Sequence, residues 1–325
     1  MMNKRFRRGL GALMLAATAV ARPTLAQTFP DRPVRIFVNT APGGLTDVMT
    51  RLVAQHMGEH LQQSVVVENK AGGDGLIGIR AVKAAPADGY TLLATAGTVA
   101  LQMAVRQEPG YDLLKDFTGI GLIGRSPFLM VVAPTIPDKT FGDFITRAKA
   151  APGKLSYASA GVGTAPHLAA ERIVQQMGVK VMHVPYKGNG AAMPDVMAGR
   201  VDTILEAYGS SSGKLKSGQL RALGVTSTSR IPALPDVPTM AEQGVSGYSY
   251  YTWLCFLAPA GTPKAAVQRL SDAMRAAIAS KAIKDRFRED GMEAMEMSPD
   301  EFNQYLAKEV DLAQKAVVEL GVPKQ

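Results

Sequence analysis

The sequence is poor in the residues that most often carry redox or metal chemistry. Among 325 residues there are one cysteine, one tryptophan and four histidines, and aromatic residues make up 6%. The single cysteine, Cys255, excludes an intrachain disulfide. It lies in the apolar run WLCFLAP, which predicts a buried structural thiol. Since Cys255 and the histidines do not have the spacing of a metal site, we expect neither a metal nor a cofactor.

Long apolar runs are absent after the N-terminal segment, so no later stretch is expected to span a membrane. The chain begins with basic NKRFRRG, apolar LGALMLAATAVA and then TLA before Gln27. This pattern predicts a signal peptide over residues 1–26, removed on export from the cytoplasm. Arg7-Arg8 leaves twin-arginine export open, although the surrounding residues favour the general secretory route.

The mature chain also lacks a strong charge. The formal net charge is +8, and the signal segment contributes five positive charges without an acid, which leaves 8 − 5 = +3; its charges are Lys4, Arg5, Arg7, Arg8 and Arg22. Such a mild balance argues against a nucleic-acid partner. It is compatible with anionic ligands.

Strand and helix patterns alternate from residue 30 onward, as in a mostly parallel α/β sheet. The first series predicts strands at 34–40, 64–69 and 90–97 and helices at 46–61 and 76–85. A further strand is expected at 127–134. A second series then runs through helices 141–152, 165–177 and 191–199 and strands 154–160, 181–186, 202–208 and 220–227. A last strand is expected at 251–259, followed by helices 264–280 and 299–320.

The order of these elements predicts two lobes, each a mostly parallel sheet flanked by helices. The chain crosses between them near residues 125–132 and again near 248–258, which implies two hinge strands. We therefore expect residues 1–26 as signal peptide, residues 27–127 plus 247–325 as lobe 1, and residues 128–246 as lobe 2. A cleft between lobes is a common ligand site, and we expect a monomer that closes on its ligand.

Three catalytic patterns occur in incomplete contexts. HMGEH at 56–60 matches a zinc-protease pattern, but Gly58 interrupts it and no third ligand is apparent. GDGLIG at 73–78 follows the second strand, whereas a dinucleotide site needs it after the first. GSSSG at 209–213 resembles a nucleophile elbow around Ser211, but no histidine follows His183, so we expect a small flexible turn there. No catalytic residue is predicted.

Two glycine-rich junctions connect a predicted strand to a predicted helix, APGGLTD at 41–47 and SAGVGTAPH at 159–167. The start of a helix has unpaired N–H groups and partial positive charge. Glycine lets an anion approach that backbone, and threonine adds a hydroxyl. Each junction alone is equally well explained as a tight turn. The presence of one junction in each lobe favours binding of a small carboxylate in the cleft.

The whole mature chain resembles the extracytoplasmic substrate receptors of tripartite tricarboxylate transporters, the Bug receptors. The matching segments, in the family's order, are FPDRPVRIFV, PGGLTD, VVVENKAGG, APADGYTLL, YASAGVGT with HLAAE, HVPYKG, LRALGVTS, LPDVPTMAEQG and APAGTP. The resemblance implies a two-lobe periplasmic binding-protein fold of type II character. It also implies a protein that is not an enzyme and that captures a carboxylated metabolite for membrane permease subunits.

The resemblance also implies the ligand-binding residues. They are Gly43, Gly44, Thr46 and Asp47 in a first loop, Ser159, Ala160, Gly163, Thr164 and His167 in a second, Thr95, Ala96 and Gly97 as a third wall, and Glu206. Asp47 and His167 either contact the ligand or hold their loops. Leu45 stands where the family commonly has a third glycine, and Leu205-Glu206-Ala207 where it often has Phe-Asp-Asn. Both departures are expected to line the cleft and alter specificity.

The sequence thus predicts a periplasmic receptor for a small organic acid. Two other functions stay open at this stage. One is an exported hydrolase with an unrecognised active site, and the other is a ligand-sensing partner of a membrane sensor kinase.

Overall fold

The computed structural model describes residues 29–322, except residue 187, together with residue 324. The predicted signal peptide, including Arg7-Arg8, lies outside these residues. Within the described residues, no helix has both the length and the apolar character needed to cross a membrane.

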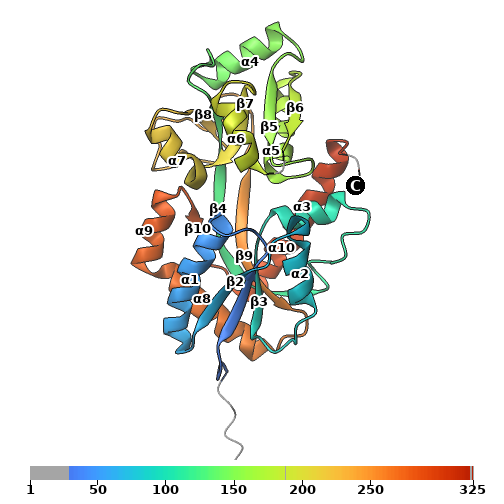
Figure 1. Cartoon of the computed structure of the whole chain (residues 1–325), viewed down its shortest axis with the longest axis vertical. Helices are drawn as coiled ribbons and strands as arrows, with labels where there is room; N and C mark the ends of the chain where they lie inside the picture. Colours follow the sequence, from blue (N-terminus) through green and yellow to red (C-terminus); the bar gives the residue numbers. More distant parts are fainter. Residues whose placement is uncertain (1–28, 187, 323, 325) are drawn as a thin grey trace, which may run out of the picture.

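The lower half of the molecule in Figure 1 is built on a sheet in the order β2-β1-β3-β9-β4. Its parallel strands are β1 (Val34–Val38), β2 (Val65–Asn69) and β3 (Thr91–Ala96). β9 (Tyr251–Pro259) runs antiparallel to both β3 and β4. The associated helices are α1 (Leu45–Leu61), the short η1 (Gly73–Gly75), α2 (Leu76–Lys83), α3 (Thr98–Val105), α8 (Lys264–Ala279), α9 (Lys281–Glu289) and α10 (Pro299–Glu319), with a short strand β10 (Glu293–Ala294) on β4.

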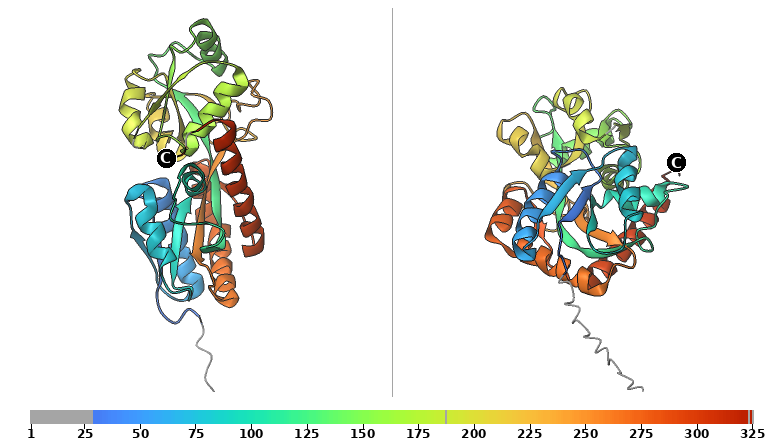
Figure 2. Two further views of the ribbon diagram at one scale, coloured as in Figure 1. Left: turned by 90° about the vertical axis from the view of Figure 1, so that its right-hand side faces the viewer. Right: turned by 60° about the horizontal axis from the view of Figure 1, so that its bottom comes forward.

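The upper half continues from the same long strand, β4 (Phe117–Val132). Residues 117–127 of β4 pair with β9, and residues 128–132 pair with β7 and β8 instead. The upper strands are β5 (Ser156–Ser159), β6 (Met182–Pro185), β7 (Thr203–Ala207) and β8 (Arg221–Val225). The helices are α4 (Phe141–Ala150), α5 (Ala165–Met177), α6 (Asn189–Met197) and α7 (Tyr208–Lys216). Two strands, β4 and β9, therefore join the halves (Figure 2).

The helices form because their apolar residues recur on one face. In α1 the buried residues include Met49, Val53 and Met57, spaced by four, and they pack in one apolar cluster with Leu270 of α8. This packing fixes α1 against the sheet and so fixes where its N-terminus points.

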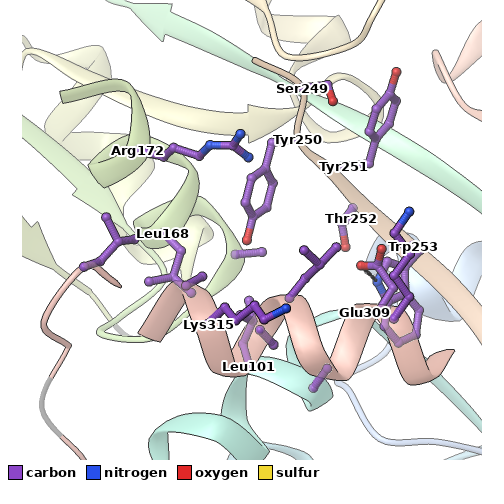
Figure 3. A pocket seen from close by; sticks show the side chains of 18 of the residues that line it. Leu101, Leu168, Arg172, Ser249, Tyr250, Tyr251, Thr252, Trp253, Glu309 and Lys315 are labelled. Atoms are coloured by element: carbon purple, nitrogen blue, oxygen red, sulfur yellow. Dashed lines mark hydrogen bonds between the residues drawn. The ribbon is translucent and has the colours of Figure 1, made fainter. Parts of the chain in front are cut away.

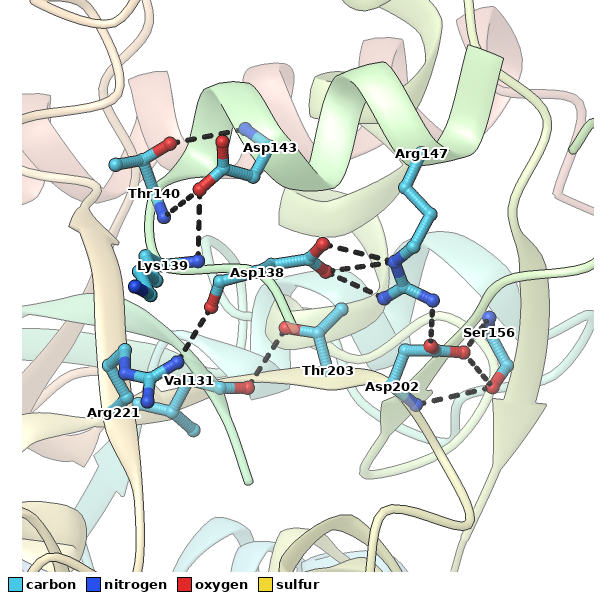
Figure 4. A network of polar contacts seen from close by, with 10 residues as sticks. All are labelled: Val131, Asp138, Lys139, Thr140, Asp143, Arg147, Ser156, Asp202, Thr203 and Arg221. Atoms are coloured by element: carbon cyan, nitrogen blue, oxygen red, sulfur yellow. Dashed lines mark hydrogen bonds and ion pairs between the residues drawn. The ribbon is translucent and has the colours of Figure 1, made fainter. Parts of the chain in front are cut away.

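The far end of the upper half is held by a charged network centred on Arg147 of α4 (Figure 4). Its guanidinium donates to Asp138 at 2.6 Å and to Asp202 at 2.8 Å. Asp202 in turn accepts from the backbone N–H of Ser156, the first residue of β5, at 2.8 Å. The network ties α4 to the start of β5 and to the segment that leads into β7.

Several elements differ from the sequence prediction. The sheet is mixed rather than mostly parallel, because β4 and β9 run antiparallel to their neighbours. β4 begins at Phe117 and not near residue 127, and α3, α7 and α9 were not predicted.

The flexible turn expected at residues 209–213 is wrong. These residues lie within α7, where Ser211 is buried and its hydroxyl donates to the carbonyl of Ala207 at 3.0 Å. Such back-bonding satisfies the serine hydroxyl inside the helix.

Candidate functional site

The strand register places two sheet edges opposite each other. β3 ends at Ala96, which pairs with Leu254 of β9, and Leu254 pairs with Gly124 of β4. β7 ends at Ala207, opposite Phe128 of β4. Gly124 and Phe128 are four residues apart, or about 13 Å along a strand. The loops that follow β1 and β3 therefore face those that follow β5, β6 and β7 (Figure 1), which is the usual ligand position in α/β sheets.

The first predicted loop lies at the lower edge, between β1 and α1. Gly43 adopts φ +82° and Gly44 is the N-cap residue of α1, without a capping side chain. Both glycines are exposed, and a Cβ on Gly43 would meet no atom within 4 Å. The N–H groups of Leu45 and Thr46, at the first two helical positions, have no partner within the helix. This loop therefore presents free backbone donors to the space between the edges.

Asp47 holds this loop. Its carboxylate accepts from the N–H of Gly43 at 2.9 Å and from the side-chain amide of Asn69 at 2.9 Å, and it pairs with Arg51 at 3.0 Å. Burial raises the pKa of Asp47, but the hydrogen bonds from Gly43, Arg51 and Asn69 outweigh it and hold the pKa below its usual range. In the structure Asp47 thus has a supporting role, and Thr46 beside it is buried.

The third predicted wall lies at the same edge and consists of the last two residues of β3, Thr95 and Ala96, and of Gly97 after it. Thr95 is fully buried, and its hydroxyl has no hydrogen-bond partner among the described residues. Gly97 donates its N–H to the carbonyl of Trp253 at 2.8 Å. A Cβ on Gly97 would lie 2.8 Å from the indole nitrogen of Trp253, so the hinge strand requires a glycine here.

The second predicted loop lies at the upper edge, and its polar groups are largely paired with one another. The hydroxyl of Ser159 accepts from the N–H of Gly161 at 3.1 Å, and the hydroxyl of Thr164 donates to the carbonyl of Gly161 at 2.7 Å. The carbonyl of Ala160 accepts from the N–H of Gly188 at 3.2 Å. The N–H of Gly163 donates to Nδ1 of His167 at 3.1 Å. This loop is therefore more tightly closed on itself than the first.

Gly163 also contacts the opposite edge of the cleft. It adopts φ +73°, and a Cβ on it would lie 2.7 Å from Cγ1 of Val105, the last residue of α3. From the sequence, we interpreted this glycine as a residue that lets an anion approach the backbone. The structure gives a different physical reason for a glycine at this position. Its N–H is used by His167, and the space beside it is filled by Val105.

Glu206 lies at the end of β7 and is only 7% exposed. Its carboxylate accepts from the N–H of Ala207 and the hydroxyl of Ser210, both at 2.9 Å. Burial raises the pKa of Glu206 despite these hydrogen bonds. Leu205 belongs to the main apolar core, and Leu45 packs partly against the α1–α8 cluster. The expectation that Leu205 lines the cleft is thus wrong.

A cavity of about 670 Å³ occupies a different place, which the sequence did not indicate (Figure 3). It lies between α5, α10 and the hinge segment 249–253, and its walls include Leu168, Arg172, Tyr250, Trp253 and Glu309. The indole of Trp253 donates to Glu309 at 2.8 Å. The predicted loops 43–47 and 159–164 do not line this cavity, although Gly97 does.

The comparison with protein families identifies the chain. The model of the tripartite tricarboxylate transporter family receptor, TctC, matches residues 49–322. The chain belongs to this family. This confirms the resemblance that the sequence motifs indicated.

Relatives of similar length support the assignment. A protein from Pseudomonas sp. strain P51, named for the tcbD-tcbE intergenic region, is 36% identical over 318 residues, which cover 96% of this chain and 94% of that protein. Protein BugT of Bordetella pertussis is 33% identical over 311 residues, which cover 95% of each chain.

Solved structures of TctC-type proteins share the fold. The R. palustris protein Rpa4515, solved with adipate, has a TM-score of 0.84 at 34% identity and covers 91% of this chain and 99% of its own. The periplasmic binding protein BugD has a TM-score of 0.81 at 33% identity, with 91% and 100% covered. MatC of Rhodopseudomonas palustris, with bound malate, has a TM-score of 0.78 at 28% identity, with 89% and 100% covered. The two-lobe periplasmic binding-protein fold is confirmed.

The TctC receptors similar to this chain are solute-binding proteins rather than enzymes. Among the described residues, no group of three or more His, Cys, Asp or Glu side chains has the arrangement of a metal site. Cys255 is buried as predicted, and burial raises the pKa of its thiol. The sequence missed one pairing that hydrolases use, between the hydroxyl of Ser159 and Nε2 of His183 at 2.6 Å. Ser159 is fully buried, so this structure gives a substrate no access to it.

Proposed function

We propose that the mature protein is a periplasmic receptor that captures a small carboxylated metabolite between the two facing strand edges. It then delivers the ligand to the membrane permease subunits of a tripartite tricarboxylate transporter. In this proposal residues 1–26 are the export signal, lobe 1 comprises residues 27–127 and 247–325, and lobe 2 comprises residues 128–246. The receptor is a monomer.

One observation carries the proposal, the open N-terminus of α1. It offers the N–H groups of Leu45 and Thr46, which have no partner within the helix, beside the exposed Gly43-Gly44 segment. The helix dipole adds partial positive charge there, which suits a carboxylate. Two TctC-type relatives were solved with the carboxylates adipate and malate, which supports a ligand of the same chemical class.

The substitution Leu45→Pro tests the anion site at the start of α1, because it removes a single backbone N–H donor. Leu45 is the first residue of α1, where proline is well tolerated and only the N–H is lost. Leu45→Ala is the matched control, because it removes the same leucine side chain and keeps the N–H. A charge-assisted hydrogen bond contributes roughly 1.5–3 kcal/mol, so Leu45→Pro should bind about 10- to 150-fold more weakly than Leu45→Ala.

The ligand itself is found by native mass spectrometry of the purified protein, followed by calorimetry with the released acid and with adipate and malate. Equal affinity of Leu45→Pro and Leu45→Ala would exclude the start of α1 as the anion site. Failure to bind any carboxylate would overturn the receptor function. N-terminal sequencing of the periplasmic protein tests cleavage before Gln27, and uptake of the acid by cells lacking the receptor tests delivery.

A further inference from the structure

Three aromatic rings lie in a stack beneath the second loop. His167 and His183 have ring centroids 4.0 Å apart with planes at 20°, and His183 lies 4.9 Å from the ring of Tyr157. Tyr157 and His183 are paired across β5 and β6, whereas His167 comes from the first turn of α5. Three separate elements therefore meet at this stack.

Each imidazole forms a hydrogen bond with one end of the loop Ser159–Thr164. Nδ1 of His167 accepts from the N–H of Gly163 at 3.1 Å, which assigns the proton of a neutral His167 ring to Nε2. Nε2 of His183 lies 2.6 Å from the hydroxyl of Ser159. That hydroxyl also accepts from the N–H of Gly161 at 3.1 Å. The two rings thus hold the loop at both its beginning and its end.

The stack is braced on its other side by Glu171 of α5. The hydroxyl of Tyr157 donates to the Glu171 carboxylate, and Nε2 of His167 faces the same carboxylate oxygen at 4.0 Å. Burial lowers the pKa of both imidazoles to about 4, and the neighbouring His167 further lowers that of His183. Both rings are therefore neutral at pH 7, and Nδ1 of His167 has a lone pair for Gly163.

We propose that His167 and His183 are positioning residues, which set the conformation of the loop Ser159–Thr164 through one specific ring nitrogen each. Neither ring needs to contact the ligand for this role. The consequence for ligand affinity rests on the proposed function, since it requires that this loop forms the upper wall of the binding site. The consequence for the loop itself does not.

The use of different nitrogens allows a sharp test. An asparagine amide oxygen can replace Nδ1 of His167, and a glutamine amide can replace Nε2 of His183. His167→Asn and His183→Gln should therefore retain the hydrogen bonds, whereas His167→Gln and His183→Asn should lose them. If the rings acted only by filling space, asparagine and glutamine at one position would not follow this crossed pattern.

Hydrogen–deuterium exchange of the ligand-free protein provides the first readout. We expect the Gly163 amide to exchange about tenfold faster in His167→Gln than in His167→Asn. The Gly161 amide should exchange about tenfold faster in His183→Asn than in His183→Gln. Amides of β1, in the other half of the molecule, serve as the internal control for global stability. Equal rates within each pair of variants would overturn the proposal.

Ligand affinity provides the second readout, measured by calorimetry with the acid that wild-type protein binds. The crossed pattern should recur, with about tenfold weaker binding in His167→Gln and His183→Asn. If wild type binds no carboxylate, the receptor function fails while the exchange measurement still decides the positioning role. If wild type binds and all four variants bind equally well, the loop positioned by the histidines does not determine affinity, and that part of the proposal is wrong.

Discussion

The contact between Gly163 and Val105 leads to a quantitative prediction for Gly163→Ala. Gly163 belongs to the upper loop and Val105 to α3 of the lower half, so this contact exists only when the two edges are close together. The added methyl group would lie 2.7 Å from Cγ1 and 3.0 Å from Cγ2 of Val105. The optimal separation of two carbon atoms is about 3.5–4.0 Å, so the halves must move apart.

The substitution has two separable costs. Overpacking of this size costs about 1–3 kcal/mol and falls on the closed form alone. We therefore expect ligand affinity to fall by roughly 5- to 150-fold, since a ligand that closes the cleft must overcome it. The positive φ of +73° adds about 1–2 kcal/mol of backbone strain in both open and closed forms, which lowers stability but not affinity.

Gly153→Ala is the matched control, because Gly153 has φ +74° and a Cβ there would meet nothing within 4 Å. It should lose similar stability and bind normally. Val105→Ala removes both clashing carbons, so Gly163→Ala combined with Val105→Ala should bind within about threefold of Val105→Ala alone. Calorimetry and thermal melts of the four variants measure both costs. A folded Gly163→Ala protein with wild-type affinity would refute the reasoning that the loop and α3 meet on closure.

Three further predictions follow from other parts of the structure. Trp253, the only tryptophan of the sequence, lies in the hinge, and its indole N–H donates a hydrogen bond to Glu309. A ligand that moves the lobes should therefore change the tryptophan fluorescence. An unchanged emission spectrum at ligand saturation would contradict hinge movement. The pKa of both histidines in the stack is about 4, below the usual 6.5, so between these values the unfolded state binds protons that the folded state does not bind. In urea titrations, the free energy of unfolding should therefore be unaffected by these histidines above pH 6.5 and should fall as the pH is lowered toward 4. Each imidazole should contribute up to about 1.4 kcal/mol per pH unit to this fall, and the partly exposed His183 less. The double variant His167→Asn with His183→Gln should have a flatter slope. Arg147→Ala leaves the carboxylate of Asp138, which is 2% exposed, without its cationic partner. It should lower the free energy of unfolding, measured in urea, by about 3–5 kcal/mol without changing ligand affinity. Wild-type stability would instead show that the carboxylates bind water or other partners.

Much of the fold could be predicted because local pattern and burial agree. The helix expected at residues 165–177 has those bounds in the structure, and the strand expected at 251–259 does as well. α3 was missed because its short sequence TVALQMAV is mostly apolar, with Thr98 and Gln102 as its only polar residues; burial against the core determines it. The first part of β4 was not predicted because the glycines in GIGLIG weaken the strand pattern. In the structure, two of these glycines leave room for neighbours that a side chain would displace, Phe302 beside Gly119 and the carbonyl of Glu293 beside Gly124.

The histidine stack could not be predicted from the sequence, for a different reason. His167 lies in the first turn of α5 and His183 lies in β6, and only the parallel register of β5 with β6 brings Tyr157 beside His183. A spacing rule for catalytic or metal sites cannot detect a contact that depends on strand pairing. The motif could not distinguish whether His167 contacts the ligand or supports the loop.

The glycines show most clearly what a sequence leaves undetermined. Gly43, Gly97 and Gly163 all follow strands at the facing edges, and the sequence motifs assigned all three to the ligand site, with Gly97 as part of a third wall. The structure separates them, since Gly97 makes room for Trp253, Gly163 makes room for Val105, and only Gly43 has open space beside it. The two edges of the cleft are therefore unequal. The lower edge, at the start of α1, offers free donors to an anion, while in the upper loop the N–H groups of Gly161 and Gly163 are already paired with Ser159 and His167. A carboxylate should therefore gain most of its binding energy at the start of α1, and the upper loop should act mainly as the surface that closes over it.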